Sequence, residues 1–365
     1  MATPLVSIAL TDDWELRGNG LGEVETLQVR PATRLMDLYD RLGVRSTFHV
    51  EVMQQLTFES YAGRYPEIAR QRDLWIEGVR SMCRRGFDVQ LHIHPQWSRE
   101  EYNGRSWKLG RLWHIVDYSP QEIREMVGRA VAYLSRLVAP AKIVAFRGGS
   151  WGMGPPSRAI LETLIAHGIR IDVSMVQGTS FLGEVIRLDY TQLECPYKAY
   201  TPDLDDIRKI GTKKCELVAI PTQTVPKTVK LRLVSKGLNL PRRIAEKVRG
   251  DAKGRAPKAE RLSHQALHNP AGGERVRGKT DYVVDFSHDH SARFLELLID
   301  ICVDRALKGG DQRSQVLVFA NHTKDLQEDY HFRRIEAAIQ HIRRGYPEIG
   351  FVTLSQVAER VSELV

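Results

Sequence analysis

The sequence of 365 residues has few cysteines, no long apolar run and no export-type N-terminus, and each absence narrows the kind of protein it encodes. Its four cysteines are widely spaced and form no C-x-x-C pair, which argues against a disulfide framework or a cysteine zinc site and favours a reducing compartment. No apolar run approaches the ~20 residues of a membrane span. The first residues, Met-Ala-Thr-Pro, include no basic side chain, and the apolar stretch ends at Leu10. We therefore expect no signal peptide and a cytoplasmic protein.

The excess of basic residues is confined to one segment. The formal net charge of the chain is +8, a value that can indicate nucleic-acid binding. Residues 226–279 hold 15 Lys and Arg against 4 Asp and Glu, a net charge of +11, so the rest of the chain carries −3. We therefore expect no nucleic-acid partner. The segment would suit an anionic membrane face or the pyrophosphate of a substrate, and a solvated loop is the alternative.

Strand-like and helical patterns alternate along the chain, which is typical of βαβ units and a parallel sheet. Strands are expected at Leu5–Leu10, Ser46–Val50, Asp88–Ile93, Ile143–Phe146, Ile169–Val173, Leu217–Ile220, Val316–Ala320 and Phe351–Leu354. The clearest helices are Pro31–Leu42, Pro120–Leu137, Pro156–His167, Ser291–Leu307 and His331–Arg344. Seven or eight strands would close an α/β barrel. We predict one domain over residues 1–365, a distorted (β/α) barrel in which residues 226–279 form an insertion before the last strands.

Side chains capable of metal binding and acid–base chemistry follow these strands where each one ends. They are Asp12, Asp13, His49, His92, His94, Arg147, Asp172, Asn321 and His322. In an α/β barrel the carboxyl ends of all strands share one rim, so residues far apart in the sequence can converge on one pocket.

Two short motifs indicate a metal site. In Asp12-Asp13, a cation bound by one carboxylate leaves the other free to act as a base, although an isolated Asp-Asp pair is more often a cap or a turn. The period of a strand points His92 and His94 to the same side. Two imidazoles and a carboxylate form a ligand set for zinc and similar cations, and histidines without a metal are the alternative.

Two further strand ends suggest the remaining parts of a hydrolytic site. Arg147 precedes a glycine pair, so it could hold a carboxylate ionised while exposed backbone N–H groups stabilise an oxyanion; a structural ion pair explains it equally well. His322 has the chemistry of a general acid. His288 and His290 are interpreted as inert.

Taken together and in this order, the motifs resemble those of the polysaccharide deacetylase family, the NodB-homology carbohydrate esterases. The resemblance extends over most of the chain, with the basic insertion as the exception. Thr-Asp12-Asp13 is similar to the family motif T-F-D-D, which implies that Asp12 is the general base and Asp13 a metal ligand. His92-Ile-His94-Pro resembles H-S/T-x-x-H with a spacing of two in place of four, which implies that both imidazoles are metal ligands.

Other segments match the family less closely. Arg147-Gly-Gly-Ser150-Trp151 resembles Arg-x-Pro-Tyr, which implies that Arg147 pairs with the base and that an N–H near Ser150 or Trp151 faces the oxyanion. Asp172 resembles the carboxylate that orients the arginine or a neighbouring group. His322, in Ala-Asn-His, resembles the general acid of Leu-x-His.

The resemblance also implies a function. Thr-Phe-His49-Val is similar to a family strand T-F-F-V, which makes His49 a candidate substrate contact. The family uses a divalent metal, commonly zinc, to hydrolyse an acetamide, usually on an amino sugar. Because no export signal is expected, we predict an intracellular N-acylated sugar linked to a nucleotide or a lipid diphosphate, in surface-polysaccharide synthesis such as that of lipopolysaccharide O-antigen. The alternatives are hydrolysis of another non-peptide C–N bond, in a ureide or cyclic amide, and a non-catalytic barrel that binds a polyanion.

Overall fold

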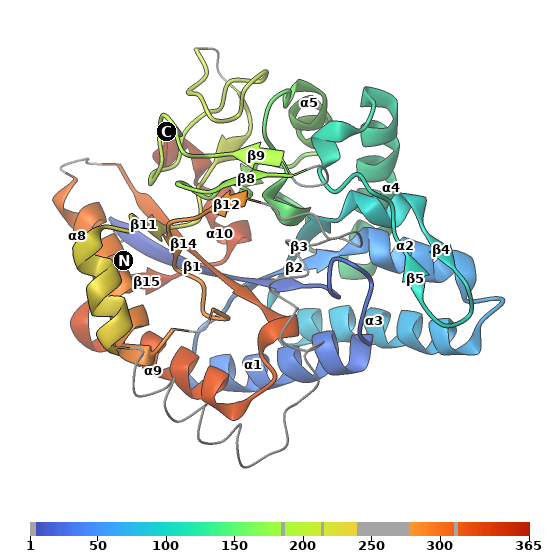
Figure 1. The fold of residues 1–365 in the computed structure, drawn as a ribbon, viewed down its shortest axis with the longest axis horizontal. Helices are drawn as coiled ribbons and strands as arrows, with labels where there is room; N and C mark the ends of the chain where they lie inside the picture. The colour runs from blue at the N-terminus through green and yellow to red at the C-terminus, as the bar shows by residue number, and fades with distance from the viewer. Residues whose placement is uncertain (1–4, 184–186, 213–214, 239–276, 289, 310–312) are drawn as a thin grey trace.

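The computed structural model describes residues 5–183, 187–212, 215–238, 277–288, 290–309 and 313–365 (Figure 1). Most of the predicted insertion, residues 239–276, lies outside the described residues.

A parallel sheet of eight strands forms the centre of the fold (Figure 1). Its strands are β1 (Val6–Trp14), β2 (Thr47–Glu51), β3 (Asp88–Ile93), β6 (Ala145–Gly148), β7 (Ile171–Asp172), β10 (Val218–Ala219), β14 (Gln315–His322) and β15 (Gly350–Phe351). Their order is β10-β7-β6-β3-β2-β1-β14, and β15 pairs with the start of β1. A bridge between Thr222, just after β10, and Val318 of β14 joins the two ends of this order. The sheet therefore curls toward a barrel, and the predicted α/β fold class is confirmed.

Helices surround this sheet (Figure 1). They are α1 (Arg30–Arg41), α2 (Val52–Tyr61), α3 (Pro66–Arg84), α4 (Pro120–Val138), α5 (Arg158–Ala166), α8 (Ala292–Lys308), α9 (Asp329–Gly345) and α10 (Leu354–Ala358), together with a helical stretch over residues 229–238. Ser119 and Glu122 form a capping box at the start of α4. Gly43 and Gly168 adopt φ values of 57° and 80° just past α1 and α5, so the predicted helix ends are confirmed.

Two predictions of secondary structure need correction. The strand expected over Phe351–Leu354 ends at Phe351, because Thr353 caps α10 through its side chain. Helices α2 and α3 were also not among those predicted, because many polar residues interrupt their apolar ones. Along the chain, these two helices lie between β2 and β3, as the helices of βαβ connections do.

The core explains why β1 can carry a functional site. All nine of its residues are buried, including two aspartates, because the strand lies inside the sheet between β2 and β14. Buried carboxylates are stable only with partners, so the side chains around β1 must supply them.

Smaller sheets lie beside the main one. They are β4 (Glu101–Tyr102) with β5 (Trp107–Lys108), β8 (Ser180–Leu182) with β9 (Arg187–Asp189) and β12 (Arg277–Lys279), and β11 (Thr224–Val225) with β13 (Tyr282–Val283). No helix in the described part of the chain combines the length and apolar character needed to cross a bilayer.

Candidate metal centre

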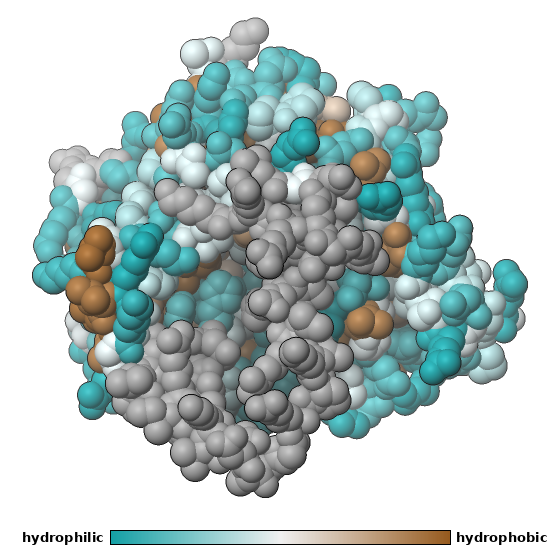
Figure 2. Space-filling model, viewed as in Figure 1, coloured by the Kyte–Doolittle hydropathy of each residue, from teal (hydrophilic) through white to brown (hydrophobic). Residues whose placement is uncertain are grey.

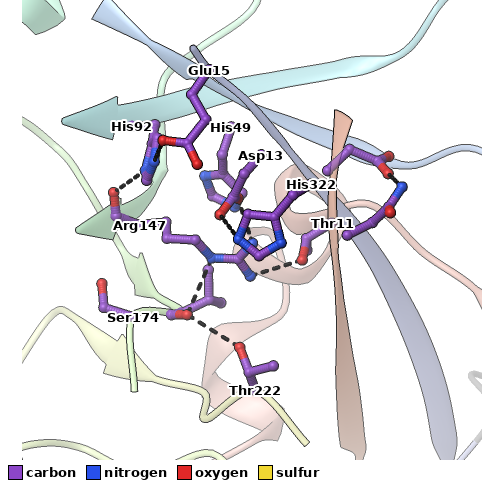
Figure 3. A network of polar contacts seen from close by, with 12 residues as sticks. Thr11, Asp13, Glu15, His49, His92, Arg147, Ser174, Thr222 and His322 are labelled. Carbon is purple, nitrogen blue, oxygen red and sulfur yellow. Dashed lines mark hydrogen bonds and ion pairs between the residues drawn. The ribbon is translucent and has the colours of Figure 1, made fainter. Parts of the chain in front are cut away.

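The register of the parallel sheet brings polar strand ends together. Asp13 of β1 pairs with His322 of β14 on one side and with His49 of β2 on the other. His92 of β3 pairs with Arg147 of β6. Because these strands run in the same direction, their carboxyl ends meet at one rim, where Figure 3 shows the labelled side chains gathered. Residues from five strands thus converge.

Alternation along β1 separates the two adjacent aspartates. The carboxylate of Asp13 accepts a hydrogen bond from Nη1 of Arg147 at 2.6 Å. The carboxylate of Asp12 points to the other face, where it accepts hydrogen bonds from Nδ2 of Asn321 at 2.7 Å and the hydroxyl of Tyr39 at 3.2 Å. Burial raises the pKa of Asp12 to about 6. Asp12, the predicted base, therefore lies outside the pocket, because a one-residue step along a strand reverses the side chain.

Glu15, which the sequence analysis missed, lies on the same side as Asp13, two residues further along. Its Oε2 contacts Nε2 of His94 and lies 3.4 Å from Nε2 of His92. These three buried residues offer ligand atoms within 4.8 Å of one another. The period of two that links Asp13 and Glu15 was a usable signal in the sequence.

The donor set of Glu15, His92 and His94 fits a divalent cation. Nδ1 of His92 lies 2.7 Å from the carbonyl oxygen of Arg147, so it carries the proton and leaves Nε2 free to bind a metal. The side-chain amide of Gln96 lies 3.1 Å from Nδ1 of His94. The same nitrogen, Nε2 of Gln96, donates to the carbonyl oxygen of Gly18 at 3.2 Å, so the amide nitrogen faces this ring. One carboxylate and two imidazoles are ligands that zinc prefers.

Lys324 compensates the charge of the candidate ligand Glu15. Its buried ammonium contacts Oε1 of Glu15, while Oε2 faces the two imidazoles. Burial alone would raise the pKa of Glu15, but the charges of Lys324 and His94 hold that pKa well below its usual value. The carboxylate is therefore ionised and its two oxygens have separate partners.

A second group of possible ligands, Asp13, Glu15 and His322, shares Glu15 with the first. Asp13 is already paired with Arg147, as Glu15 is with Lys324, so a second divalent ion would meet two buried cations. The arrangement fits one metal ion.

Asp13 has the environment of a general base. Arg147 is buried and also donates from Nη2 to the hydroxyl of Thr11 at 2.8 Å, which fixes the guanidinium (Figure 3). Burial would raise the pKa of Asp13, but the charges of Arg147, His92 and His322 lower that pKa below its usual value. Asp13 is therefore ionised and ready to accept a proton.

His322 has the environment of a general acid. Its Nε2 lies 3.4 Å from Asp13, and its Nδ1 lies 3.0 Å from Oδ2 of Asp285. Burial would lower the pKa of His322, but Asp285 and Asp13 raise it to about 9. Asp285 is not among the residues predicted from the sequence, and its other oxygen accepts hydrogen bonds from the N–H and the hydroxyl of Ser287. Asp285 follows β13, a strand of only two residues that is too short to show a period in the sequence.

Asp172 does not orient Arg147 by a hydrogen bond. Among the described residues, its hydrogen bonds come from the N–H of Ser174 at 3.1 Å and the hydroxyl of Ser174 at 2.6 Å, and that hydroxyl accepts from the N–H of Gly148. Burial raises the pKa of Asp172 to about 6. Asp172 thus contacts the loop after β6 through Ser174, and its predicted role in orienting a group next to Arg147 stays a prediction.

The loop after β6 forms one wall of the pocket. Ser150 and Trp151 adopt φ values of 52° and 55°, a left-handed conformation that is costly for Trp and that recurs at functional sites. The Ser150 hydroxyl has no hydrogen-bond partner in the described part of the chain. A Cβ on Gly149 would lie 2.7 Å from the ring of His94, so the loop packs directly against a predicted ligand.

His49 lies below the pocket and does not line it. Its Nδ1 lies 3.3 Å from the carbonyl oxygen of Leu91. Burial and the charge of Arg147 hold the pKa of His49 well below its usual value, so this ring is neutral. His49 was predicted to contact the substrate. It does not line the cavity, so it has no direct access to a molecule bound there.

A cavity of about 180 Å³ opens above the rim. It is lined by Asp13, Glu15, His92, His94, Gly148, Ser150, Trp151, Phe181, Thr280, Val283, His288, His322, Lys324 and Asp325. Of the predicted site residues, Asp13, His92, His94, Ser150, Trp151 and His322 line it, whereas Asp12, His49, Arg147 and Asp172 do not. His288, interpreted as inert, lies at its edge and 3.6 Å from Asp285.

Comparisons with known proteins identify the fold. No protein-family model and no curated protein matches the chain. Among solved structures, the chain is similar to a protein of Mycobacterium smegmatis described as a polysaccharide deacetylase, with 14% identity, coverage of 99% of this chain and 92% of that one, and a TM-score of 0.50. A Pseudomonas aeruginosa PAO1 protein of the same description has 11% identity, coverage of 98% and 90%, and a TM-score of 0.50. The chain thus has the fold of the polysaccharide deacetylases, as its motifs predicted.

Proposed function

We propose that the protein is a metal-dependent hydrolase that removes an N-acyl group from an amino sugar. The observation that carries this proposal is that Asp13 and His322, 3.4 Å apart, line the same cavity as the possible metal ligands Glu15, His92 and His94. An ionised carboxylate and a protonated imidazole 3.4 Å apart form the base and acid that amide hydrolysis needs. The fold alone does not decide the reaction.

Glu15, His92 and His94 would hold the metal, which we take to be zinc from the donor set. When bound, such a cation polarises the amide carbonyl and makes water more acidic. This assignment moves the carboxylate ligand from Asp13 to Glu15 and the base from Asp12 to Asp13.

The side chains around the cavity divide the proton transfers between them. Asp13 accepts a proton from the attacking water, and Arg147 keeps this carboxylate oriented and ionised. His322 donates a proton to the nitrogen of the leaving amine, with Asp285 stabilising the imidazolium. The proton on Asp13 can then return to His322 across 3.4 Å, which restores both groups. Backbone N–H groups at Ser150 and Trp151 are our candidates for the oxyanion contact.

The substrate we propose is an N-acetylated sugar linked to a nucleotide or lipid diphosphate. The cavity combines polar rim residues with the apolar walls of Trp151, Phe181 and Val283, a mixture suited to a sugar ring and an acetyl group. Surface-polysaccharide synthesis, as for lipopolysaccharide O-antigen, is the pathway we propose.

The described part of the basic segment supports contact with an anionic membrane. In the helical stretch 229–238, Val229 is 75% and Leu233 is 64% exposed, next to the exposed Lys230 and Arg232. Figure 2 shows this apolar patch at the left edge of an otherwise mainly hydrophilic face. A basic stretch with exposed apolar residues fits a peripheral site on anionic lipid, and we propose a cytoplasmic protein that works there.

The test is metal analysis of the purified protein together with assays of acetate release from UDP-linked N-acetylated amino sugars. We expect one metal ion per chain, and acetate release that stops with a chelator and returns with added zinc. Ring opening of a ureide without acetate release would assign another C–N bond. Salt-dependent RNA binding without any hydrolysis would replace the enzyme with a polyanion-binding barrel.

A further inference from the structure

We propose that the start of α2, with Glu51 and Gln54, and Gln28 from the helical turn Glu25–Val29 position the metal ligands. This inference rests on the proposed function, because it concerns how the same metal site is built. All three side chains are buried, yet none of them lines the cavity.

Two glutamines form hydrogen bonds with the backbone on both sides of Glu15. Oε1 of Gln54 accepts a hydrogen bond from the N–H of Leu16 at 3.1 Å. Nε2 of Gln28 donates to the carbonyl oxygen of Trp14 at 3.1 Å, and Nε2 of Gln54 donates to Oε1 of Gln28 at 2.9 Å. The two amides thus form a continuous bridge from residue 14 to residue 16, and Glu15 is the residue between them.

This bridge begins where the sheet stops holding the chain. Strand β1 ends at Trp14, so Glu15 lies on irregular backbone just beyond the parallel ladder. Without sheet pairing, the N–H of Leu16 needs another acceptor when buried, and Gln54 supplies it. A carboxylate ligand on a loop needs such support, because a metal site tolerates displacements of only a few tenths of an ångström.

Glu51 connects the same helix to a second ligand. Its Oε1 accepts hydrogen bonds from the N–H groups of Met53 and Gln54 at 2.8 and 3.1 Å, which caps the start of α2. Its Oε2 accepts from the N–H of His94 at 2.5 Å. The start of α2 therefore fixes the backbone of both Glu15 and His94, which follow the ends of two different strands, β1 and β3.

Ordinary core packing does not account for this arrangement. Burying two amides and a carboxylate is costly unless their hydrogen bonds are satisfied, and an apolar side chain would fill the same volume at lower cost. Here the polar side-chain atoms form hydrogen bonds with the backbone of Trp14, Leu16 and His94. Partners that orient metal ligands typically change metal affinity by about 10- to 100-fold when they are lost.

The experiment compares neighbouring glutamines in α2. Gln54→Met removes the bridge at nearly constant volume. Gln55→Met is the matched control, because Gln55 is equally buried but donates to the hydroxyl of Tyr133 at 2.9 Å, away from the site. The zinc Kd of each purified protein is measured by competition with a chromophoric chelator, and thermal unfolding of the metal-free proteins is measured in parallel.

We expect Gln54→Met to raise the zinc Kd by about 10-fold or more, and Gln55→Met to leave it at the wild-type value even if both variants lose stability. Should Gln54→Met fail to fold, Gln28→Met tests the other half of the bridge and is expected to weaken zinc binding in the same direction. Equal zinc Kd values for wild type and the folded bridge variant, or equal losses in the bridge and control variants, would overturn the inference. A wild-type protein that binds no zinc would instead overturn the proposed function.

Discussion

Asp12 and Asp13 are adjacent in the chain, but their carboxylates lie on opposite faces of β1. That of Asp13 pairs with Arg147 at 2.6 Å, whereas that of Asp12 is held by Asn321 at 2.7 Å. The motif that first indicated a metal site thus contributes one carboxylate to the cavity, and Glu15 supplies the other. This relationship determines the predictions that follow.

The first prediction separates the base from the ligand. We expect Asp13→Asn to retain the metal and to lose activity by about 10²- to 10⁴-fold, because it removes proton abstraction. Glu15→Gln should lose the metal as well as activity. Metal content after gel filtration and initial rates of acetate release measure both effects. Metal loss in Asp13→Asn with retention in Glu15→Gln would reverse the two roles.

The second prediction concerns Asp12 as a structural residue. Burial raises its pKa from 3.8 to about 6, so the folded state binds its proton more tightly than the unfolded state, and the contribution to stability falls as the pH rises through this range. Asp12→Asn removes that loss. The free energy of unfolding of Asp12→Asn, measured relative to that of wild type, should therefore increase by on the order of 1 kcal/mol from pH 5 to pH 8. Denaturant titrations at both pH values would detect it, and a constant difference would contradict the assigned pKa.

The third prediction concerns the alkaline limit of activity. The pKa of His322 is raised to about 9, so its acidic form is present below this pH and is lost as the pH rises through it. Asp285→Asn removes the nearest negative charge and lowers that pKa. The alkaline limb of the pH profile of kcat/KM should therefore move to lower pH. An unmoved limb would show that another group provides it.

Lys324 gives a prediction about stability and metal together. Lys324→Met leaves the buried Glu15 without its cation, and breaking a buried pair in this way typically costs about 3–5 kcal/mol. The metal-free variant should be strongly destabilised, whereas the metal restores the missing positive charge. We expect a larger rise in Tm on adding zinc than in wild type. An equal rise in both proteins would show that Lys324 does not compensate Glu15.

Gly149 tests the packing of the loop against His94. A Cβ there would lie 2.7 Å from ring atoms of His94 and from the carbonyl oxygen of Ile93, so Gly149→Ala must displace the ring and weaken metal binding. Gly154→Ala is the control, since nothing lies within 4 Å of its new Cβ. Zinc Kd values for both variants check this. Similar values in the two would exclude the contact as a constraint on the metal site.

Much of the architecture could be predicted from local patterns. Apolar runs separated by helical spacing indicate a parallel sheet, because helices cover both faces of such a sheet and its strands are therefore apolar on both sides. Strand ends then place His92, Arg147 and His322 at one rim, and the register of the sheet agrees. Pairings between distant segments could not be predicted in this way, since neither Lys324 nor Asp285 shows its partner through any period in the sequence.

By itself, the sequence determined the α/β class, the rim and the pair of imidazoles at the end of β3, because burial and strand period are local properties of the chain. Only the tertiary structure decided which carboxylate lies beside those imidazoles and which buried Lys or Arg forms an ion pair with each buried carboxylate. These choices depend on side chains that meet across the sheet from positions some 300 residues apart, such as Glu15 and Lys324. Such contacts follow from how the sheet curls, a property of the folded chain as a whole.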